Sequence, residues 1–379
     1  MRLEPLLTSK EVVIVCGAGG VGKTTTAAAL AATAAVHLDC RVLALTVDPA
    51  RRLATAMGLE RFGNVEHLVP PEAFVAAGVR PRGELYAAML DTKASWDDLV
   101  RRHAPDVATR EAILDNALYR NITAKFVHSH DYIAMERLHE LHTSGQYDLI
   151  VVDTPPTRHA IDFLDAPERM VEFFSSRLIR WLVAPYGSRI VSAASKPFSL
   201  VADRVLGAQF IHDIAEFFVL LQTMEHGFVD RARAVTRTLE GRRSSFVVVS
   251  SLEPAPVREA EFFVDAIGRR GFHLGACVLN RTLPEYFRSR EGLDAADVMI
   301  ARADDLAGEL VADPGDRAAV AGVLREVAES YRNYRLVATR EAEQLAELTV
   351  PRELVVTVPT LERDVASLGD LLEIGAYLW

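Results

Sequence analysis

The sequence predicts an α/β fold with a doubly wound, mostly parallel sheet flanked by helices and an inserted helical subdomain. Apolar runs rich in Val, Ile and Leu recur without polar–apolar alternation, at 11–16, 41–47, 147–153, 245–250, 274–280 and 353–358. Strands of this composition are buried on both faces, as in a parallel sheet covered by helices. Segments with helical periodicity separate them, for example 24–38 and 257–271, which is the order of a doubly wound fold.

Two spacers between these strands are too long for simple crossovers, and each holds several helical patterns. We expect a single domain over 1–379, with the helical insertions above the C-terminal edge of the sheet, where α/β proteins bind ligands. The predicted nucleotide-binding core covers 1–82, 147–164 and 241–379, and the predicted helical subdomain covers 83–146 and 165–240. Residues 305–320 are expected to form an exposed loop between helices.

The composition is that of a soluble protein with a sizeable core. Of 379 residues, 50% are hydrophobic and 25% are charged, and the net charge of −10 argues against a nucleic-acid partner. No stretch reaches the roughly 18 uncharged apolar residues of a membrane span, and the N-terminal residues lack a signal-peptide pattern, so we expect a cytoplasmic location. Cys16, Cys40 and Cys277 lie far apart in or beside apolar runs, which favours buried reduced thiols over a metal site.

The stretch VVIVCGAGGVGKTTTAAAL at 12–30 fits the phosphate-loop (P-loop) pattern G-x-x-x-x-G-K-[ST], between an expected strand and an expected helix. Its glycines let backbone N–H groups converge on phosphates, and the helix N-terminus adds positive partial charge. Lys23 is expected to act in catalysis at the β- and γ-phosphates, and Thr24 to place its hydroxyl on Mg²⁺. The residues expected to bind ATP here are Gly17, Gly19, Gly20, Val21, Gly22, Lys23, Thr24 and Thr25.

Two aspartates follow other expected strands. Asp48, in LTVDPARRLATAMG, either holds and deprotonates the attacking water or caps a helix before Pro49. Asp153 ends the run LIVVD, a position suited to binding Mg²⁺ directly or through water. The combination predicts a P-loop NTPase that hydrolyses ATP, with Thr24, Asp48 and Asp153 as the expected metal ligands.

In this order, GAGGVGKTTT, DPARRLA and VVDTPPTRHAIDFLDAP resemble the deviant-Walker ATPases related to the arsenite-pump ATPase (ArsA). This family includes the ATPase that delivers tail-anchored membrane proteins. The likeness covers most of the chain and is greatest to the ArsA-like anion-transporting ATPases of actinobacteria. It implies a homodimer or pseudo-dimer that closes over two ATP molecules and opens on hydrolysis.

The resemblance also implies roles for single residues. Asp48 becomes the switch I aspartate that activates water, and 153–157 become switch II. Asn280 matches the asparagine that reads adenine, although a strand-terminal turn residue explains it equally well. The segment after the last strand, with Pro359, Thr360 and Leu361, resembles the loop that packs on the base. Glu253 and Glu259 correspond either to acidic residues near the dimer interface or to a solvated helix face.

One residue departs from the family pattern. Ala18 stands where the family carries a lysine that reaches across the dimer to the partner's phosphates. A cation at the transferring phosphoryl group contributes strongly to rate. Hydrolysis is therefore slow, or an arginine such as Arg51 or Arg52 substitutes, or a lysine-bearing paralogue pairs with this chain.

The helical subdomain carries apolar residues around wide arcs of 168–184 and 210–229. These arcs predict either a groove for an apolar client or the subdomain's own core and dimer contacts. His139 and His142 share a helix face, as part of a histidine-rich stretch with His128 and His130, but the spacing favours a polar face over a metal site. Glu136 is either a family residue under the nucleotide loops or a surface charge.

The leading hypothesis is a Mg²⁺-dependent ATP hydrolase whose dimer closure reshapes the helical subdomain, which handles an apolar client or a membrane partner. One alternative is the ATPase subunit of an anion (arsenite-type) efflux pump, although the scattered cysteines do not support thiolate binding of a metalloid. The other is an ATP-binding, weakly hydrolysing subunit that a lysine-bearing paralogue completes in a heterodimer.

Overall fold

The computed structural model describes residues 2–47, 56–57, 59, 63–116, 118–120, 127–154, 165–176, 208–311 and 313–379. Asp48, Arg51, Arg52 and the predicted switch II residues 155–157 lie outside the described residues. The interpretations of these positions therefore stay predictions.

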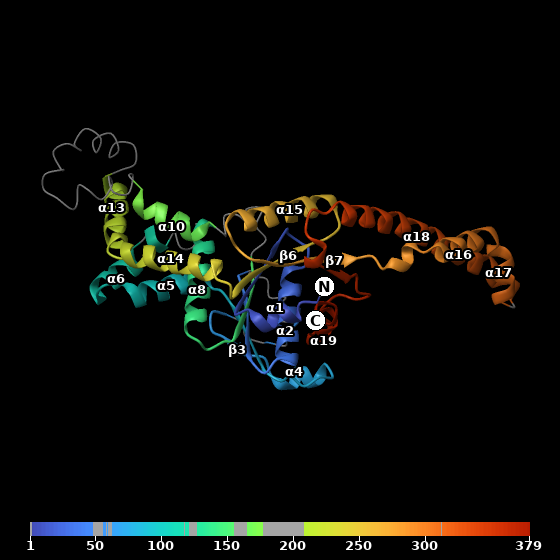
Figure 1. Ribbon diagram of the computed structural model, residues 1–379, viewed down its shortest axis with the longest axis horizontal. Coiled ribbons are helices and arrows are strands. Elements are labelled where there is room, and N and C mark those ends of the chain that lie inside the picture. The colour runs from blue at the N-terminus through green and yellow to red at the C-terminus, as the bar shows by residue number, and fades with distance from the viewer. Residues whose placement is uncertain are drawn as a thin grey trace.

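The described strands form one sheet in the order β3-β4-β2-β5-β1-β6-β7-β8 (Figure 1). They are β1 (Val12–Gly17), β2 (Arg41–Thr46), β3 (His67–Leu68), β4 (Glu84–Met89), β5 (Leu149–Asp153), β6 (Ser244–Ser250), β7 (Leu274–Thr282) and β8 (Val355–Pro359). Neighbouring strands run parallel, except that β3 pairs antiparallel with β4 at the edge. The predicted mostly parallel, doubly wound sheet is confirmed.

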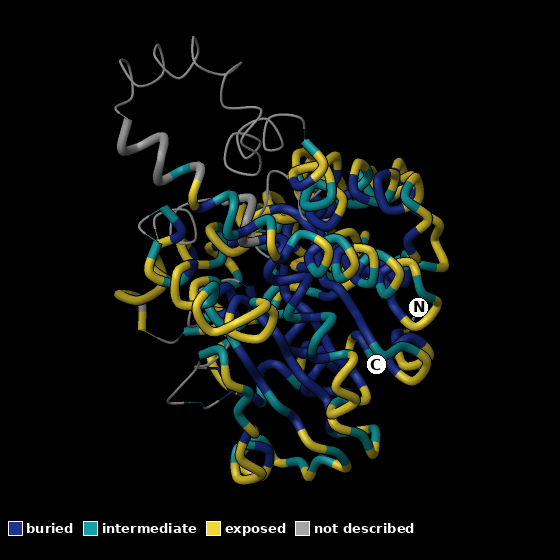
Figure 2. The backbone as a smooth tube through the Cα atoms, turned by 90° about the vertical axis from the view of Figure 1, so that its left-hand side faces the viewer, coloured by how far each residue is buried: buried dark blue, intermediate teal, exposed yellow. Residues whose placement is uncertain are grey.

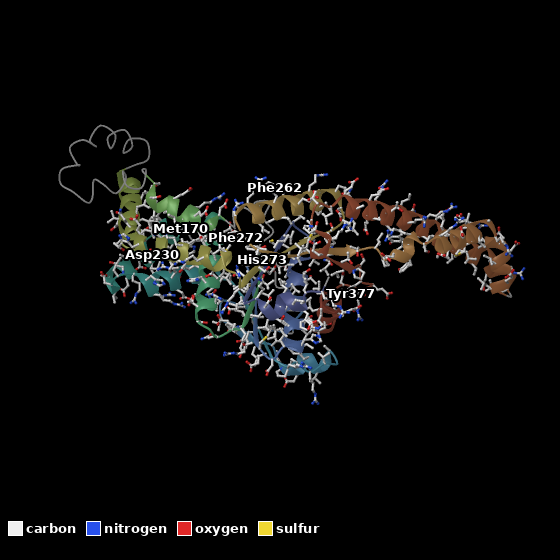
Figure 3. All side chains as sticks on the ribbon, in the orientation of Figure 1. Met170, Asp230, Phe262, Phe272, His273 and Tyr377 are labelled. Atoms are coloured by element: carbon white, nitrogen blue, oxygen red, sulfur yellow. The ribbon has the colours of Figure 1, made fainter. Side chains whose placement is uncertain are left out.

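Helices cover both faces of this sheet, and the central strands are buried throughout (Figure 2). Alternate residues of β1 enter different cores because successive strand side chains point to opposite faces. Val13 and Val15 pack with α2 (Lys23–His37) and α19 (Leu368–Leu378), whereas Val12 and Ile14 pack on the side of α15 (Pro254–Arg269) and the helical subdomain. Among the described residues, α1 (Glu4–Ser9) and α4 (Pro71–Ala76) also belong to the core. Phe262 on α15 points outward to solvent (Figure 3).

One strand was misplaced by the sequence analysis. Residues 84–89, assigned there to the start of the helical subdomain, form β4 and belong to the sheet. Their sequence, ELYAAM, consists largely of good helix formers, so local propensity favours a helix. Parallel pairing with β2 over its whole length overrides this preference.

The helical subdomain lies beyond one end of the sheet (Figure 1), and its buried side chains continue the hydrophobic core on the α15 side of the sheet. Its described helices are α5 (Thr92–His103), α6 (Val107–Asp115), α8 (Val127–Thr143), α10 (Ala166–Ser175), α13 (Ala208–Gln222) and α14 (Glu225–Glu240). Trp96, Tyr132, Phe174 and Phe228 meet at its centre, with the other three rings 5.1–6.1 Å from that of Phe228. Of the apolar residues noted in the sequence, Phe174, Phe217, Leu221 and Phe228 are buried in this core, whereas 177–184 lie outside the described residues.

A helical arm, residues 290–347, projects from the other end of the sheet (Figure 1). It contains α16 (Arg290–Ala301), α17 (Ala303–Leu310) and the long α18 (Pro314–Glu347), after a 3-10 turn at Glu285–Arg288. The expectation of an exposed loop over 305–320 is wrong, because α17 and α18 occupy most of it. The DPG sequence starts a helix there: Asp313 caps the N-terminus by accepting from Gly315 N, and Pro314 occupies the first turn.

Candidate functional site

The P-loop connects β1 to α2 at the C-terminal edge of the sheet, between β5 and β6. Gly20 and Gly22 have φ of +81° and +96°, values that residues with a Cβ rarely adopt. A Cβ on Gly22 would lie 2.2 Å from Nδ2 of Asn280, so this glycine also allows a close approach of β7. The loop is a concave run of backbone amides of the kind that binds anions.

Lys23 begins α2 and turns back over the loop. Its side chain is buried, and its Nζ donates a hydrogen bond of 2.7 Å to the carbonyl of Ala18. The Ala18 side chain is buried in the core on the α2 side of the sheet. The lysine ammonium thus lies inside the curve of the loop, where the phosphates of a bound nucleotide are expected.

Asp153 lies at the end of β5, directly beside the start of the P-loop. It is only 1% exposed, and its Oδ2 accepts a hydrogen bond of 2.9 Å from the Thr46 hydroxyl at the end of β2. The next residue, Thr154, ties this strand end to β1, because both its backbone N and its hydroxyl donate to Val15 O. The anchoring role of Thr154 was missed, since a threonine before two prolines carries no specific sequence signal.

Asn280 fixes the opposite side of the loop. It is buried at the end of β7, and its Nδ2 donates a hydrogen bond of 2.8 Å to Val21 O. The structure therefore brings Asn280 to the P-loop, as expected for a residue of the nucleotide site. It lies within a strand and in contact with the loop, so the alternative of a simple strand-terminal turn residue does not describe it.

Arg281 is a site residue that sequence reasoning missed. Its φ is +59°, and among the described residues it is the only non-glycine with a positive φ. Asn280 pairs with Val358 and Thr282 with Pro359, so Arg281 is an extra residue that bulges out of the β7–β8 ladder. Its guanidinium Nη1 lies 3.4 Å from Gly20 O on the rim of the P-loop. No local sequence pattern predicts this bulge.

The segment at the end of β8 lies next to this bulge. Thr360 N donates a hydrogen bond of 3.0 Å to Thr282 O, and Leu361 packs partly against the core on the α2 side. Pro359, Thr360 and Leu361 therefore stand beside Asn280 and the P-loop. Their predicted contact with the base stays a prediction.

The sulfur chemistry near the loop is inert. Cys16 precedes the P-loop on β1, and burial raises the pKa of its thiol to about 12. Cys277 on β7 is buried as well, Cys40 is half-buried, and all three are free thiols. The predicted burial is confirmed for Cys16 and Cys277 but not for Cys40.

Several predicted residues lie in other parts of the molecule. Glu136 is buried in the helical subdomain, where its carboxylate lies 2.6 Å from Arg231 Nε and accepts a hydrogen bond from the Tyr132 hydroxyl. Burial raises the pKa of Glu136, and the arginine opposes this shift. The alternative of a surface charge is wrong. Glu253 and Glu259 are exposed at the start of α15.

The histidines of α8 serve structural contacts. His139 Nδ1 lies 3.2 Å from the Thr238 hydroxyl, and His142 Nε2 lies 2.9 Å from Glu11 Oε2. The side chains of His128 and His130 are not among those described. Within the described part of the chain, no group of three or more His, Cys, Asp or Glu side chains could hold a metal ion.

A hollow of about 480 Å³ opens between α10 and α14. Its lining mixes acidic, basic and small side chains, namely Pro167, Glu168, Val171, Glu172, Ala232, Arg233, Thr236 and Arg237. Nearby, Asp230 and Met170 lie on these two helices (Figure 3). The mixed lining of this hollow gives no direct support for the apolar groove that the sequence suggested, and 177–184 of that prediction lie outside the described residues.

The oxygen donors beside the P-loop suit Mg²⁺. Thr24 offers a hydroxyl in the first turn of α2, and Asp153 offers a carboxylate already oriented by Thr46. Hard oxygen ligands of this kind are those that Mg²⁺ prefers, together with the phosphates of its nucleotide.

Comparisons with known proteins agree with this geometry. The family model "Anion-transporting ATPase" (ArsA_ATPase) matches residues 10–297. An "ATPase ASNA1 homolog" of Leishmania infantum is 30% identical over 222 residues, which cover 51% of this chain and 52% of that protein. "ATPase get3" of Aspergillus terreus is 26% identical over 278 residues, covering 72% of this chain and 73% of its own length. "Uncharacterized protein SCO2128" of Streptomyces coelicolor is 28% identical over 279 residues, covering 72% of this chain and 62% of its own.

The matches cover only part of this chain and of its relatives. The chain spans about half the length of the Leishmania relative that it matches. The match to the family model ends inside α16, so most of the helical arm lies outside it. In the part of the chain that the structure describes, none of the helices has the length and apolar character needed to cross a membrane.

Proposed function

Because the chain belongs to the ArsA-type family of anion-transporting ATPases, we propose that it is a Mg²⁺-dependent ATP hydrolase. The observation that carries this proposal is the buried Lys23 ammonium, held inside the curve of the P-loop by Ala18 O at 2.7 Å. A buried cation in a nest of glycine amides, beside the carboxylate of Asp153, is a site preorganised for a triphosphate.

The chain's own residues divide the work of hydrolysis. Backbone amides of 19–23 donate to the phosphates, and Lys23 exchanges its bond to Ala18 O for the β- and γ-phosphate oxygens. Asp48 orients the water and accepts its proton while the water oxygen attacks the γ-phosphorus and the bond to ADP breaks. Asn280 and the segment 359–361 hold the base.

Thr24 and Asp153, with Asp48 through water, are the residues proposed to hold Mg²⁺. The bound ion neutralises charge on the phosphate oxygens.

The finer part of the proposal concerns assembly. We infer a dimer that closes over ATP and thereby reshapes the helical subdomain, which handles an apolar client or a membrane partner. The names of the relatives support ATPase activity, and the hollow between α10 and α14, with its mixed lining, gives no direct support for an apolar groove. An anion-efflux role is the alternative that the family's name suggests, and turnover that rises with added anion would identify it.

Ala18 favours a second candidate, a weakly hydrolysing subunit that a lysine-bearing paralogue completes. ATP turnover by the purified chain, measured over a wide range of protein concentration with Lys23→Ala as control, decides between the two. Turnover per chain that rises with concentration and vanishes in the control supports a self-sufficient dimer. Tight ATP binding with no turnover at any concentration refutes the stand-alone enzyme.

A further inference from the structure

The order of the strands separates the two ends of a bound nucleotide. Asp153, one of the residues proposed to hold Mg²⁺, ends β5 on one side of β1, whereas Asn280 lies near the end of β7 on the other side. Because Mg²⁺ bridges the β- and γ-phosphates, these phosphates are expected towards β5 and the base towards β7 and β8. Arg281 directly follows Asn280 and therefore lies at the base end of the site.

Asn280 and Arg281 reach neighbouring carbonyls of the P-loop from different depths. Asn280 is buried and donates to Val21 O, whereas Arg281 is exposed and its Nη1 lies 3.4 Å from Gly20 O. In a regular strand two consecutive side chains point to opposite faces of the sheet. The bulge, with its strained φ of +59°, brings both of them to the same loop. The long side chain of Arg281 thus extends from the end of β7 to the rim of the P-loop, exposed to solvent.

We infer that Arg281 covers one face of the nucleotide base and so adds affinity for ATP and ADP alike. Arginine suits this task because its planar guanidinium stacks on aromatic rings and its aliphatic stem packs on apolar surface. The proposed base segment 359–361 stands beside it, since Thr360 N bonds to Thr282 O at 3.0 Å. This inference rests on the proposed ATP site, but it requires only binding and not turnover.

Equilibrium binding of three ligands tests this contact: ATP, ADP, and inorganic triphosphate, which has the phosphates of ATP but no base. Arg281→Gly and Arg281→Asn both remove the guanidinium and tolerate a φ of +59°. We expect each to weaken ATP and ADP by the same factor, about three- to thirtyfold, and to leave the affinity for triphosphate within about twofold of wild type. Arg281→Lys keeps a charged stem but loses the planar group, so it recovers only part of the affinity.

Three other results overturn the inference. A loss confined to ATP means that Arg281 contacts the terminal phosphate, a matching loss for triphosphate means that it only supports the loop, and unchanged affinity for all three means that it contacts none of them. Failure of the hydrolase proposal looks different, because wild-type protein then binds ATP without turnover and the three ligands can still be compared. Wild-type protein that binds no ATP refutes both. Thermal denaturation of each variant without nucleotide shows whether the fold is intact.

The base end of the site is also joined to the helical arm. Leu283, two residues after Arg281, donates its backbone N–H to Glu341 Oε2 on α18 at 2.8 Å. Helix α18 returns from the tip of the arm to the sheet at this point (Figure 1). Thr282 lies between Arg281 and Leu283, and its hydroxyl donates to Val358 O on β8 at 3.3 Å. The segment that follows the bulge is therefore held by both β8 and the arm.

We propose that Glu341 is a positioning residue for Arg281 and acts through Leu283. As the extra residue of a bulge, Arg281 has no partner of its own in the β7–β8 ladder, so its conformation depends on the residues on either side. A carboxylate that accepts from a backbone N–H makes a charge-assisted bond, which is stronger than a neutral one. The match to the family model ends at residue 297, so Glu341 lies outside the matched region.

The same three ligands test the role of Glu341. Glu341→Ala is expected to weaken ATP and ADP by about two- to tenfold and to spare triphosphate, whereas Glu341→Gln, whose amide oxygen still accepts from Leu283 N, stays near wild type. In the Arg281→Gly background, Glu341→Ala adds no further loss. Glu343→Ala changes an exposed glutamate of the same helix and serves as the control. Unchanged ATP affinity in Glu341→Ala, additive losses with Arg281→Gly, or a loss that extends to triphosphate overturns the positioning role.

Discussion

The contact between Gly22 and Asn280 makes the P-loop sensitive to a single methyl group. In Gly22→Ala the new Cβ would lie 2.2 Å from Asn280 Nδ2, at a φ of +96°. The left-handed conformation costs about 1–2 kcal/mol for a residue with a Cβ. Displacing Asn280 also leaves Val21 O without its buried donor, which costs about 1–3 kcal/mol more. We therefore expect Gly22→Ala to lower the free energy of unfolding by about 2–5 kcal/mol.

The loop offers a matched control for this prediction. Gly20 has a similar φ of +81°, but a Cβ there meets nothing within 4 Å. Gly20→Ala is therefore expected to cost only the conformational part, about 1–2 kcal/mol. Chemical denaturation of both variants gives the difference, and equilibrium binding of ATP shows whether the same contact orders the site.

A double-mutant cycle separates the steric term from the conformational one. Asn280→Ala removes both the clash and the hydrogen bond, so in that background Gly22→Ala should cost no more than Gly20→Ala does in the wild type. The reasoning is refuted if Gly22→Ala and Gly20→Ala destabilise the protein equally. It also fails if the two substitutions at 22 and 280 are simply additive.

Three further expectations concern the rest of the molecule. Glu136→Leu leaves the mostly buried Arg231 guanidinium without its carboxylate partner. We therefore expect the free energy of unfolding to fall by about 3 kcal/mol, which calorimetry of this variant and of the wild type measures. Phe228→Ala opens a cavity at the centre of the helical subdomain and costs about 3–5 kcal/mol by denaturant unfolding; a loss below about 1 kcal/mol would contradict the packing described for it. Alkylation of native protein near pH 8, followed by mass spectrometry, should label the half-buried Cys40 well before Cys16. The thiol of Cys16 is buried, and its pKa of about 12 keeps it protonated at this pH. Equal labelling of the two cysteines would disprove the inert, protonated state described for Cys16.

The sequence allowed the sheet and the place of the P-loop between a strand and a helix to be predicted, since both depend on local patterns. Uninterrupted apolar runs mark buried parallel strands, and the P-loop motif carries its own strand, turn and helix. The error at β4 has a different origin. The segment ELYAAM forms a strand because it pairs with β2 and β3, and its own residues do not indicate a strand. The helix start at Asp313 was included in a predicted exposed loop over 305–320, because Pro and Gly occur both in loops and at helix starts.

Arg281 could not be predicted for a related reason. Its left-handed φ depends on the offset between β7 and β8, where Asn280 and Thr282 pair with consecutive residues of β8. That offset is a relation between strands separated by the entire helical arm. In the sequence, Arg281 is an ordinary arginine after an asparagine, and only the fold places it at the loop.

Three P-loop carbonyls accept hydrogen bonds from side chains of the same chain. Those of Ala18, Gly20 and Val21 accept from Lys23, Arg281 and Asn280, at 2.7, 3.4 and 2.8 Å. Two of these donors are cations on long side chains, which phosphate oxygens attract more strongly than a carbonyl does. The third donor, Asn280, is a short neutral amide on a buried strand, so a phosphate does not attract it in the same way. If the proposed ATP site is right, we expect Lys23 to leave Ala18 O for a phosphate oxygen and Asn280 to keep its hydrogen bond to Val21 O.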